Sequence, residues 1–464
     1  MGSLFGTSGV RGHTVSEITP QLAMDIGSSV GALIGNGKAC TGRDTRFGSH
    51  MLELAARSGL MSQGINVIEC GVVPTPVLAY MVSEEADGGI MVTGSHLPPD
   101  MVGIIPLLED GAYLPDEQVK VVEESIVHRA FLETRVDNSK VGSLNEATDC
   151  LSRYRDRVLS LIDSDLIARN RFRVAVDPVN GTACGFLADI LEFIGCDAAE
   201  INGEPSGIPG RPPEPRASTL TDLCAMVREN SLDLGVGLDT DADRVVFIDE
   251  KGIPLSEDVI GVIFADHVFA AKKGAFVTPV NSSGIVEWFR RTRDVKLEYC
   301  KIGQPATVEA IKRAGSIYSY EESGKYYFAE EVNWCDGLLA TLKLLEILAS
   351  NKITLSQLVD RYPRFYQVKH TINLPAEKKD AAMSLIRDHV LPTLGDDCLQ
   401  MVDIDGFKLV YPDDSWLLLR ASGTEPVLRV YSDSPDRMRA ETLVKKGIEL
   451  VNEIVNSAAG QHSH

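Results

Sequence analysis

Residues 89–99 read Gly89-Ile90-Met91-Val92-Thr93-Gly94-Ser95-His96-Leu97-Pro98-Pro99, an apolar run followed by a hydroxyl, an imidazole and two prolines. This order predicts a strand that ends in a rigid loop, with the Ser95 hydroxyl at its tip. Such a serine can act as a nucleophile or phosphoryl carrier, while the backbone amides of the loop hold an anion. The alternative is a serine and a histidine that only satisfy hydrogen bonds of the turn.

The chain around this loop alternates short apolar runs with longer segments of helical period, for example at residues 21–33, 39–41, 50–64 and 65–69. Alternation of this kind predicts βαβ units and a mostly parallel sheet. One turn sequence recurs, as Val176-Asp177-Pro178-Val179-Asn180-Gly181-Thr182, as Val277-Thr278-Pro279-Val280-Asn281-Ser282-Ser283 and, more loosely, as Thr41-Gly42-Arg43-Asp44-Thr45. The repeat predicts duplicated α/β units, each the size of a domain.

The predicted fold class is α/β, with three doubly wound α/β domains followed by a smaller α+β domain. Turn-rich or charged segments place the boundaries at residues 1–147, 148–251, 252–364 and 365–464. The last domain departs from the α/β alternation, because its predicted strands and helices no longer take turns along the chain. Its strands are predicted at residues 370–374, 406–411 and 415–420, and its helices at 378–394 and 435–455.

The sequence of 464 residues has a formal net charge of −21 and nine cysteines without a Cys-x-x-Cys pair. The charge argues against binding to nucleic acid or to anionic membranes, and any phosphate ester must be met by positive charge gathered locally. The cysteines indicate reduced thiols rather than a disulfide or zinc framework. We find neither a long apolar run nor a secretion signal, and we therefore expect a cytoplasmic protein.

Three carboxylates stand at alternate positions in Leu238-Asp239-Thr240-Asp241-Ala242-Asp243-Arg244, between two segments that read as strands. Asp239, Asp241 and Asp243 would repel one another unless they share a cation, and carboxylates are the ligands of hard divalent metals such as Mg²⁺. A helix-loop-helix calcium site, with Glu250 as a fourth ligand, is the competing hypothesis. It fails because Arg244 occupies the position that requires glycine and because both flanks are strand-like.

Three further loops carry polar groups suited to a sugar phosphate. Arg420-Ala421-Ser422-Gly423-Thr424-Glu425-Pro426 combines a guanidinium, hydroxyls and a glycine, which together can hold one phosphate. Ser319-Tyr320-Glu321-Glu322-Ser323-Gly324-Lys325 mixes acceptors and donors, as sugar hydroxyls require. Phe5-Gly6-Thr7-Ser8-Gly9-Val10-Arg11-Gly12 lacks the ending of a nucleotide phosphate loop, but its Arg11 could meet a transferring phosphoryl group.

The five loops, in this order and at this spacing, resemble those of the α-D-phosphohexomutase family, which includes phosphomannomutase, phosphoglucomutase and phosphoglucosamine mutase. By this resemblance residues 5–12 are the N-terminal loop, 93–98 the phosphoserine loop, 239–244 the metal loop, 321–324 the sugar loop and 420–426 the phosphate loop. The resemblance covers essentially the whole chain and implies four domains around a central cleft. It implies that Ser95 is phosphorylated and, with Asp239, Asp241 and Asp243, holds one Mg²⁺, while Arg244 orients the phosphoserine. It also implies that Glu321 and Ser323 bind the sugar ring and that the non-reacting phosphate is bound by Arg420, Ser422, Gly423 and Thr424.

The resemblance implies a reaction in which the phosphoserine donates its phosphoryl group to a hexose monophosphate. The resulting 1,6-bisphosphate turns over in the cleft and returns its other phosphate to Ser95, and free hexose 1,6-bisphosphate serves as activator. Mg²⁺ and Arg11 would neutralise charge on the transferring group. By resemblance we expect mannose or glucosamine phosphates as substrates, with glucose possible, and a monomer or homodimer.

Three departures from the family pattern leave the general acid/base open. Leu97 replaces the asparagine of Ser-His-Asn-Pro, Val102-Gly103-Ile104-Ile105 stands where the family commonly has Asn-Gly-x-Lys, and the sugar loop ends in Lys325 rather than histidine. Arg11, His96 and Lys325 are therefore all candidates. Two alternatives remain open: a phosphotransferase that forms or hydrolyses sugar bisphosphates, and a noncatalytic sugar-phosphate-binding protein.

Overall fold

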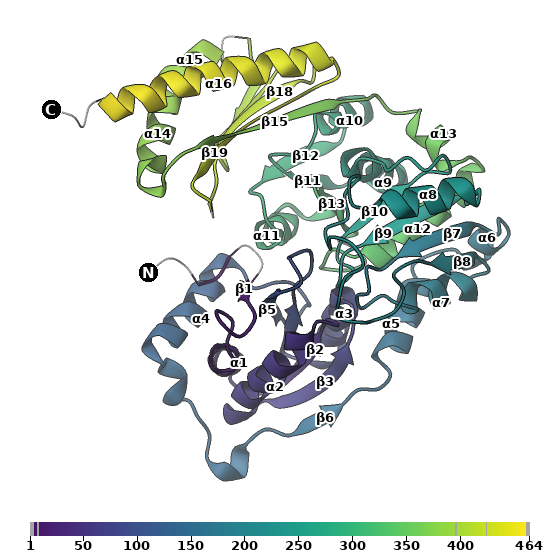
Figure 1. Cartoon of the computed structure of the whole chain (residues 1–464), viewed down its shortest axis with the longest axis vertical. Coiled ribbons are helices and arrows are strands. Elements are labelled where there is room, and N and C mark those ends of the chain that lie inside the picture. The colour runs from purple at the N-terminus through teal and green to yellow at the C-terminus, as the bar shows by residue number, and fades with distance from the viewer. Residues whose placement is uncertain (1–3, 7–8, 395–396, 424, 461–464) are drawn as a thin grey trace.

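The computed structural model describes residues 4–6, 9–394, 397–423 and 425–460. Figure 1 shows four sheets that follow one another in chain order along an arc, from the purple N-terminal sheet to the yellow-green C-terminal one. The first three sheets are packed by helices in α/β fashion and the fourth unit departs from that pattern, as the sequence predicted; the fourth sheet is antiparallel. None of the helices in the described part of the chain has the length and apolar character that crossing a bilayer requires.

The first sheet has the strand order β1-β5-β4-β2-β3-β6. Its central strand β4 is buried along its whole length, with parallel β2 on one side and antiparallel β5 on the other. Register places Arg11 opposite Gly103, and Gly103 opposite Thr93, so three strands bring Arg11 beside the end of β4. The elements are β1 (Val10–His13), α1 (Pro20–Ile34), β2 (Lys38–Arg43), α2 (Phe47–Ser62), β3 (Asn66–Val72), α3 (Thr75–Glu85), β4 (Gly88–Thr93), β5 (Met101–Leu108), α4 (Asp116–His128), η1 (Ala130–Leu132), η2 (Asn138–Lys140) and β6 (Leu144–Glu146).

Helices α1 and α2 illustrate how local sequence fixes these elements. The Thr19 side chain caps α1 by accepting a hydrogen bond from the Leu22 amide, and Pro20 fills a first-turn position that needs no donor. A Cβ on Gly27 of α1 would lie 2.1 Å from the Ala56 carbonyl oxygen of α2. Because this glycine has no side chain, the two helices approach closely on one face of the sheet.

The second sheet has the order β10-β9-β7-β8, and the third has the order β12-β11-β13-β14. In both, the inner strands are parallel and one edge is closed by an antiparallel hairpin strand, β10 or β14. The second unit contains α5 (Cys150–Leu159), α6 (Ser164–Ala168), β7 (Arg173–Asp177), α7 (Phe186–Phe193), β8 (Asp197–Glu200), α8 (Thr221–Glu229), β9 (Leu234–Leu238) and β10 (Val245–Ile248). The third contains α9 (Glu257–Ala271), β11 (Ala275–Pro279), α10 (Ile285–Arg293), β12 (Lys296–Cys300), α11 (Gln304–Ala314), β13 (Ser316–Glu321), β14 (Lys325–Tyr327), α12 (Gly337–Asn351) and α13 (Leu355–Val359).

The fourth sheet is antiparallel, with the order β15-β19-β18-β17-β16, and the long helix α16 packs on it. Two of its strands, β16 and β19, were not predicted from the sequence, and β19 directly follows the predicted phosphate loop. The elements are β15 (Tyr366–Asn373), η3 (Ala376–Lys378), α14 (Lys379–Leu385), η4 (Ile386–Val390), α15 (Leu391–Leu394), β16 (Gln400–Val402), β17 (Phe407–Val410), β18 (Trp416–Ala421), β19 (Val427–Ser434) and α16 (Arg437–Gly460).

One apolar core runs through the first three units and reaches the fourth through Trp416 and Leu418, whereas the rest of the fourth unit has a core of its own. A fully buried lysine lies at the junction of the third and fourth units. Lys408 of β17 donates to the Ser282 carbonyl oxygen, and its Nζ lies 4.2 Å from the centre of the Tyr299 ring. The fourth unit is therefore joined to the third by a polar contact inside a largely apolar interface.

Candidate active site

The predicted phosphoserine loop begins where β4 ends. Ser95 is buried and adopts a positive φ of 46°, and its amide donates to the Thr93 hydroxyl at 2.8 Å. Its Oγ donates to Asp239 Oδ2 at 2.7 Å and lies 3.2 Å from Nδ1 of His96. The structure thus brings together the predicted nucleophile, its neighbouring imidazole and the first carboxylate of the predicted metal loop.

An arginine that the sequence analysis did not select holds this loop in place. Nη2 of Arg46 donates to the carbonyl oxygens of Ser95 and Leu97, and its Nη1 donates to those of Pro98 and Met101. A left-handed backbone is unfavourable for a residue other than glycine, so it needs such support. The guanidinium is a rigid fork of donors, and it fixes the carbonyl groups of the loop around Ser95.

The three aspartates form the turn between β9 and β10, as the strand-like flanks predicted, and all three are buried. Each offers a carboxylate oxygen, and these atoms lie within 4.8 Å of one another. Burial, together with Asp241 and Asp243, raises the pKa of Asp239 well above its ordinary value. One oxygen each of Asp241 and Asp243 is buried without a hydrogen-bond partner among the described residues. Repelling carboxylates with free oxygens fit a divalent cation, and this triad could bind one.

Positive groups surround the triad. Nζ of Lys325 lies 2.9 Å from Asp243 Oδ2 and donates to Gln304 Oε1 at 2.7 Å. Burial is the largest influence and opposes the charge of Lys325, but Asp243, Cys335 and Glu321 together outweigh it and raise the pKa of Lys325, so the amine stays protonated. Burial and then Arg244, Arg11 and Lys325 lower the pKa of His96 far below its ordinary value.

The predicted sugar loop is the turn between β13 and β14, in which Glu321 pairs across the hairpin with Lys325. Glu321 is buried and accepts a hydrogen bond from the Tyr327 hydroxyl. Ser323 has a φ of 81°, and its amide donates to Glu257 Oε1 at 2.9 Å. The backbone of the loop is therefore supported from α9.

The predicted phosphate loop starts at the end of β18. Nε of Arg420 lies 2.9 Å from Asp405 Oδ2, Ser422 is buried, and Gly423 is exposed. Thr424, which the sequence analysis also assigned to phosphate binding, lies outside the described residues. Register places Arg420 directly opposite Arg429 of β19, a residue that the sequence analysis missed. Each guanidinium also has a carboxylate partner, Asp405 for Arg420 and, at 2.9 Å, Glu425 for Arg429, so the pair gathers two partly compensated cations at the cleft.

A cleft of about 830 Å³ connects these loops and is lined by all four units. Its walls gather cationic side chains in a chain whose net charge is −21, as binding of a phosphate ester requires. Acidic groups also line it, among them Glu321 of the sugar loop. The cations are Arg11, Arg216, Arg244, Lys325, Lys369, Arg420 and Arg429.

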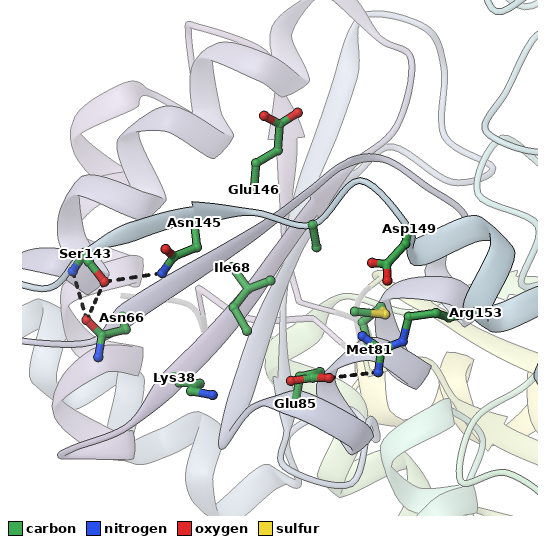
Figure 2. A pocket seen from close by; sticks show the side chains of 11 residues that line it. Lys38, Asn66, Ile68, Met81, Glu85, Ser143, Asn145, Glu146, Asp149 and Arg153 are labelled. Atoms are coloured by element: carbon green, nitrogen blue, oxygen red, sulfur yellow. Dashed lines mark hydrogen bonds and ion pairs between the residues drawn. The ribbon is translucent and has the colours of Figure 1, made fainter.

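A smaller hollow of about 390 Å³ lies between β3, β6, α3 and α5. Figure 2 shows its polar lining, in which Arg153 pairs with Glu85 at 2.8 Å and Asn66 accepts from Ser143. None of the predicted site residues lines it. The chemistry therefore concentrates in the larger cleft.

Comparison with known families agrees with this geometry. Four family profiles match the chain in order: phosphoglucomutase/phosphomannomutase alpha/beta/alpha domain I at residues 2–133, domain II at 152–252, domain III at 256–365, and the C-terminal domain at 372–449. The chain belongs to the phosphoglucomutase/phosphomannomutase family. Its enzymes are phosphohexomutases, and the resemblance inferred from the sequence is confirmed.

Relatives of this chain carry different substrate names. A phosphoglucomutase/phosphomannomutase from Thermococcus kodakarensis is 34% identical, with 98% of this chain and 99% of the relative covered. A probable phosphoglucosamine mutase from Methanopyrus kandleri is 31% identical (98% and 99% covered), and a phosphopentomutase from Thermococcus kodakarensis is 32% identical (98% and 99% covered). The crystal structure of a phosphoglucomutase/phosphomannomutase family protein from Burkholderia thailandensis has the same fold, with a TM-score of 0.87 at 24% identity and 97% of each chain covered.

In this chain the recurring turn sequences support the predicted chemical loops, one in each α/β unit. In the first, the Asp44 carboxylate accepts from the Gly94 amide of the phosphoserine loop. In the second, the Thr182 amide donates to the Thr240 carbonyl oxygen of the metal loop. In the third, the Thr278 hydroxyl donates to the Tyr320 carbonyl oxygen of the sugar loop. The internal repeat was therefore the sequence signal that could have located these supporting residues.

Proposed function

We propose that the protein interconverts hexose 1-phosphates and hexose 6-phosphates through a phosphoserine at Ser95 and a 1,6-bisphosphate intermediate. The observation that carries the proposal is the 2.7 Å hydrogen bond from Ser95 Oγ to Asp239, inside a buried carboxylate triad. A binding protein needs neither a hydroxyl nor a cation site at this point. The matching family and the cationic cleft agree with this function.

In the proposed first step, a sugar hydroxyl attacks the phosphorus of the phosphoserine. The bond from phosphorus to the sugar oxygen forms, the bond to Ser95 Oγ breaks, and the sugar hydroxyl loses its proton. The proton that the sugar hydroxyl loses is balanced by one that the leaving Ser95 Oγ gains, and we assign delivery of that proton to His96, because its Nδ1 lies 3.2 Å from Ser95 Oγ. Lys325 is assigned to charge stabilisation, because its salt bridge with Asp243 keeps it protonated.

Asp239, Asp241 and Asp243, with Ser95, would hold one Mg²⁺, which supplies positive charge to the transferring phosphoryl group when bound. Arg11 and Arg244 line the cleft beside this loop and would neutralise the remaining charge. We assign binding of the non-reacting phosphate to Arg420, Ser422 and Gly423, together with Thr424, and add Arg429 because it faces Arg420.

The bisphosphate can turn over because the residues that bind the sugar ring and the residues that bind the non-reacting phosphate are separate from the reacting serine. Glu321 and Ser323 would bind hydroxyls on the ring, while the phosphate loop binds whichever phosphate is not reacting. Because the same anchors serve both orientations, the bisphosphate can present either phosphate to Ser95. The second transfer then restores the phosphoserine and releases the isomeric monophosphate.

Mannose and glucosamine phosphates are our preferred substrates, and glucose phosphate is possible. The relatives' names span glucose, mannose, glucosamine and pentose, so the substrate class is part of the proposal. All nine cysteines are free, which fits the cytoplasm that we propose as its location. A monomer or homodimer stays a prediction.

The experiment uses purified protein with Mg²⁺ and a trace of glucose 1,6-bisphosphate as activator. Mannose, glucosamine, glucose and ribose 1-phosphates are supplied in turn, and the products are separated by chromatography. A hexose 6-phosphate supports the proposal. Conversion of ribose 1-phosphate alone, or tight binding of sugar phosphates without turnover, contradicts it.

The second candidate function is a phosphotransferase that forms or hydrolyses sugar bisphosphates. It is favoured by Ile105, which stands where the family commonly has a lysine. In the same assay this activity would release inorganic phosphate or accumulate bisphosphate without an isomeric monophosphate.

A further inference from the structure

The segment between β8 and α8, residues 201–220, has no helix or strand, although it lies inside a compact domain. Long irregular segments of this kind usually have a function. Its sequence, Ile201-Asn202-Gly203-Glu204-Pro205-Ser206-Gly207-Ile208-Pro209-Gly210-Arg211-Pro212-Pro213-Glu214-Pro215-Arg216, is rich in proline, which restricts the backbone. We call residues 201–216 the proline loop.

The proline loop is fastened to the strand ends that carry the metal loop. Nε of Arg211 donates to Asp177 Oδ2 at 2.6 Å, and its Nη2 donates to the Leu238 carbonyl oxygen at 2.7 Å. Leu238 is the last residue of β9 and directly precedes Asp239. The Gly210 amide donates to Asn180 Oδ1 at 2.8 Å. The position of the proline loop relative to the aspartate triad is therefore fixed.

This anchoring places Glu214 beside Arg244. Oε1 of Glu214 accepts from Arg244 Nη1 at 3.2 Å, and its Oε2 lies 2.6 Å from Nη2 of Arg216. Glu214 is thus held between two guanidinium groups at the wall of the cleft. The contact draws the tip of the Arg244 side chain toward the proline loop.

On its other side, Arg244 stops short of the metal carboxylates. Its Nε lies 3.8 Å from both Asp239 Oδ2 and Asp243 Oδ1. Both Arg244 Nε and Asp243 Oδ1 are buried without a hydrogen-bond partner among the described residues. A charged donor and a charged acceptor that could pair are therefore held apart, beyond hydrogen-bond distance.

We propose that Glu214 is a positioning residue that holds Arg244 away from the aspartate triad, which leaves Asp239 and Asp243 free to bind Mg²⁺. The proposal rests on the proposed function only in assigning Mg²⁺ to the triad. Without Glu214, the guanidinium would close onto Asp243, and an arriving cation would have to displace it. Glu214 would act through Arg244 and need not touch the substrate.

The test is titration calorimetry of Mg²⁺ into the full-length chain, a readout that does not depend on turnover. We expect Glu214→Ala to weaken Mg²⁺ binding about tenfold, as loss of a competing charge-assisted hydrogen bond predicts. The control is Glu204→Ala, which removes an exposed carboxylate from the same loop and should leave binding unchanged.

A double-mutant cycle separates positioning from structural damage. If Arg244 is the competitor, Glu214→Ala should have no effect in an Arg244→Gln background, because no guanidinium remains to close onto the triad. Wild-type Mg²⁺ affinity in Glu214→Ala overturns the proposal. An equal loss in both backgrounds also overturns it, because it assigns the effect to the fold of the loop.

The double-mutant cycle can be interpreted even if the proposed mutase function is wrong. A wild-type protein that binds Mg²⁺ but isomerises no sugar phosphate would refute the mutase and leave the calorimetry to decide the role of Glu214. An active mutase whose Glu214→Ala variant binds Mg²⁺ normally would refute only the positioning role.

Discussion

Replacement of Arg46 by lysine should release the phosphoserine loop while keeping the local charge. The guanidinium donates to four carbonyl oxygens, those of Ser95, Leu97, Pro98 and Met101. The lysine ammonium carries its donors on one nitrogen at the end of a flexible side chain, so it cannot reproduce the planar, forked geometry of the guanidinium. Some of the buried carbonyl groups would therefore lose a partner, and the positive φ of Ser95 would be supported mainly by the Thr240 hydroxyl, which donates to the Ser95 carbonyl oxygen at 2.7 Å, and by the Thr93 hydroxyl.

The size of the effect follows from these contacts. Hydrogen bonds from a charged donor contribute about 1.5–3 kcal/mol each, and they are not additive. If lysine keeps about half of them, the free energy of opening the loop should fall by roughly 3–5 kcal/mol. A displacement of Ser95 by about 1 Å should slow phosphoryl transfer by about a hundredfold.

Two assays measure these effects in Arg46→Lys. Amide hydrogen exchange at residues 94–101 reports opening of the loop, and rapid quenching after addition of hexose 1,6-bisphosphate reports phosphorylation of the protein. Arg129→Lys is the matched control, because Arg129 is exposed at the end of α4. Wild-type exchange and a wild-type phosphorylation rate in Arg46→Lys would refute the claim that this fork positions Ser95.

Three further predictions concern the metal loop and the interior. In Gly181→Ala the new Cβ would lie 2.4 Å from the Thr240 carbonyl oxygen and would push the metal loop away. Calorimetry should therefore show weaker Mg²⁺ binding. Unchanged Mg²⁺ binding would contradict the claim that the turn at Gly181 supports the metal loop. Lys325→Met leaves the buried Asp243 carboxylate without its ammonium partner. The free energy of unfolding should therefore fall by roughly 3 kcal/mol without Mg²⁺ and by less with Mg²⁺. Equal losses in thermal melts with and without Mg²⁺ would contradict this prediction. Burial lowers the pKa of Lys408 to about 7. Between pH 7 and about 10.4 the unfolded chain holds one proton more than the folded chain. The free energy of unfolding should therefore rise with pH by at most about 1.4 kcal/mol per pH unit. Denaturant titrations at each pH should show no such rise in Lys408→Met.

Residue type at fixed spacing was enough to indicate from the sequence which groups would lie together, although their chemical roles stay predictions. A serine at a strand end and aspartates at alternate positions can be recognised from a few neighbouring residues. The structure places the Ser95 hydroxyl within hydrogen-bond distance of Asp239. The alternation of strands and helices likewise predicts the α/β units, because parallel strands need a crossover between them.

Unlike the residues of the internal repeat, the supporting residues Arg46 and Glu214 could not be predicted, because their role depends on tertiary position. Arg46 lies 49 residues before Ser95 in the chain. Its hydrogen-bond acceptors are backbone carbonyl groups, which every residue has, so the side-chain sequence does not indicate the contact. Glu214 lies in a segment without periodicity, and only the fold places it beside Arg244. Strand β19 was missed because the turn signals of the phosphate loop run directly into it.

The central claim, that Ser95 carries the phosphoryl group, is tested most directly by peptide mass spectrometry of the protein after brief incubation with Mg²⁺ and hexose 1,6-bisphosphate. We predict one phosphoryl group per chain, on Ser95, and neither phosphorylation nor mutase activity in Ser95→Ala. A phosphoryl group on any other residue, or full mutase activity in Ser95→Ala, would contradict the account.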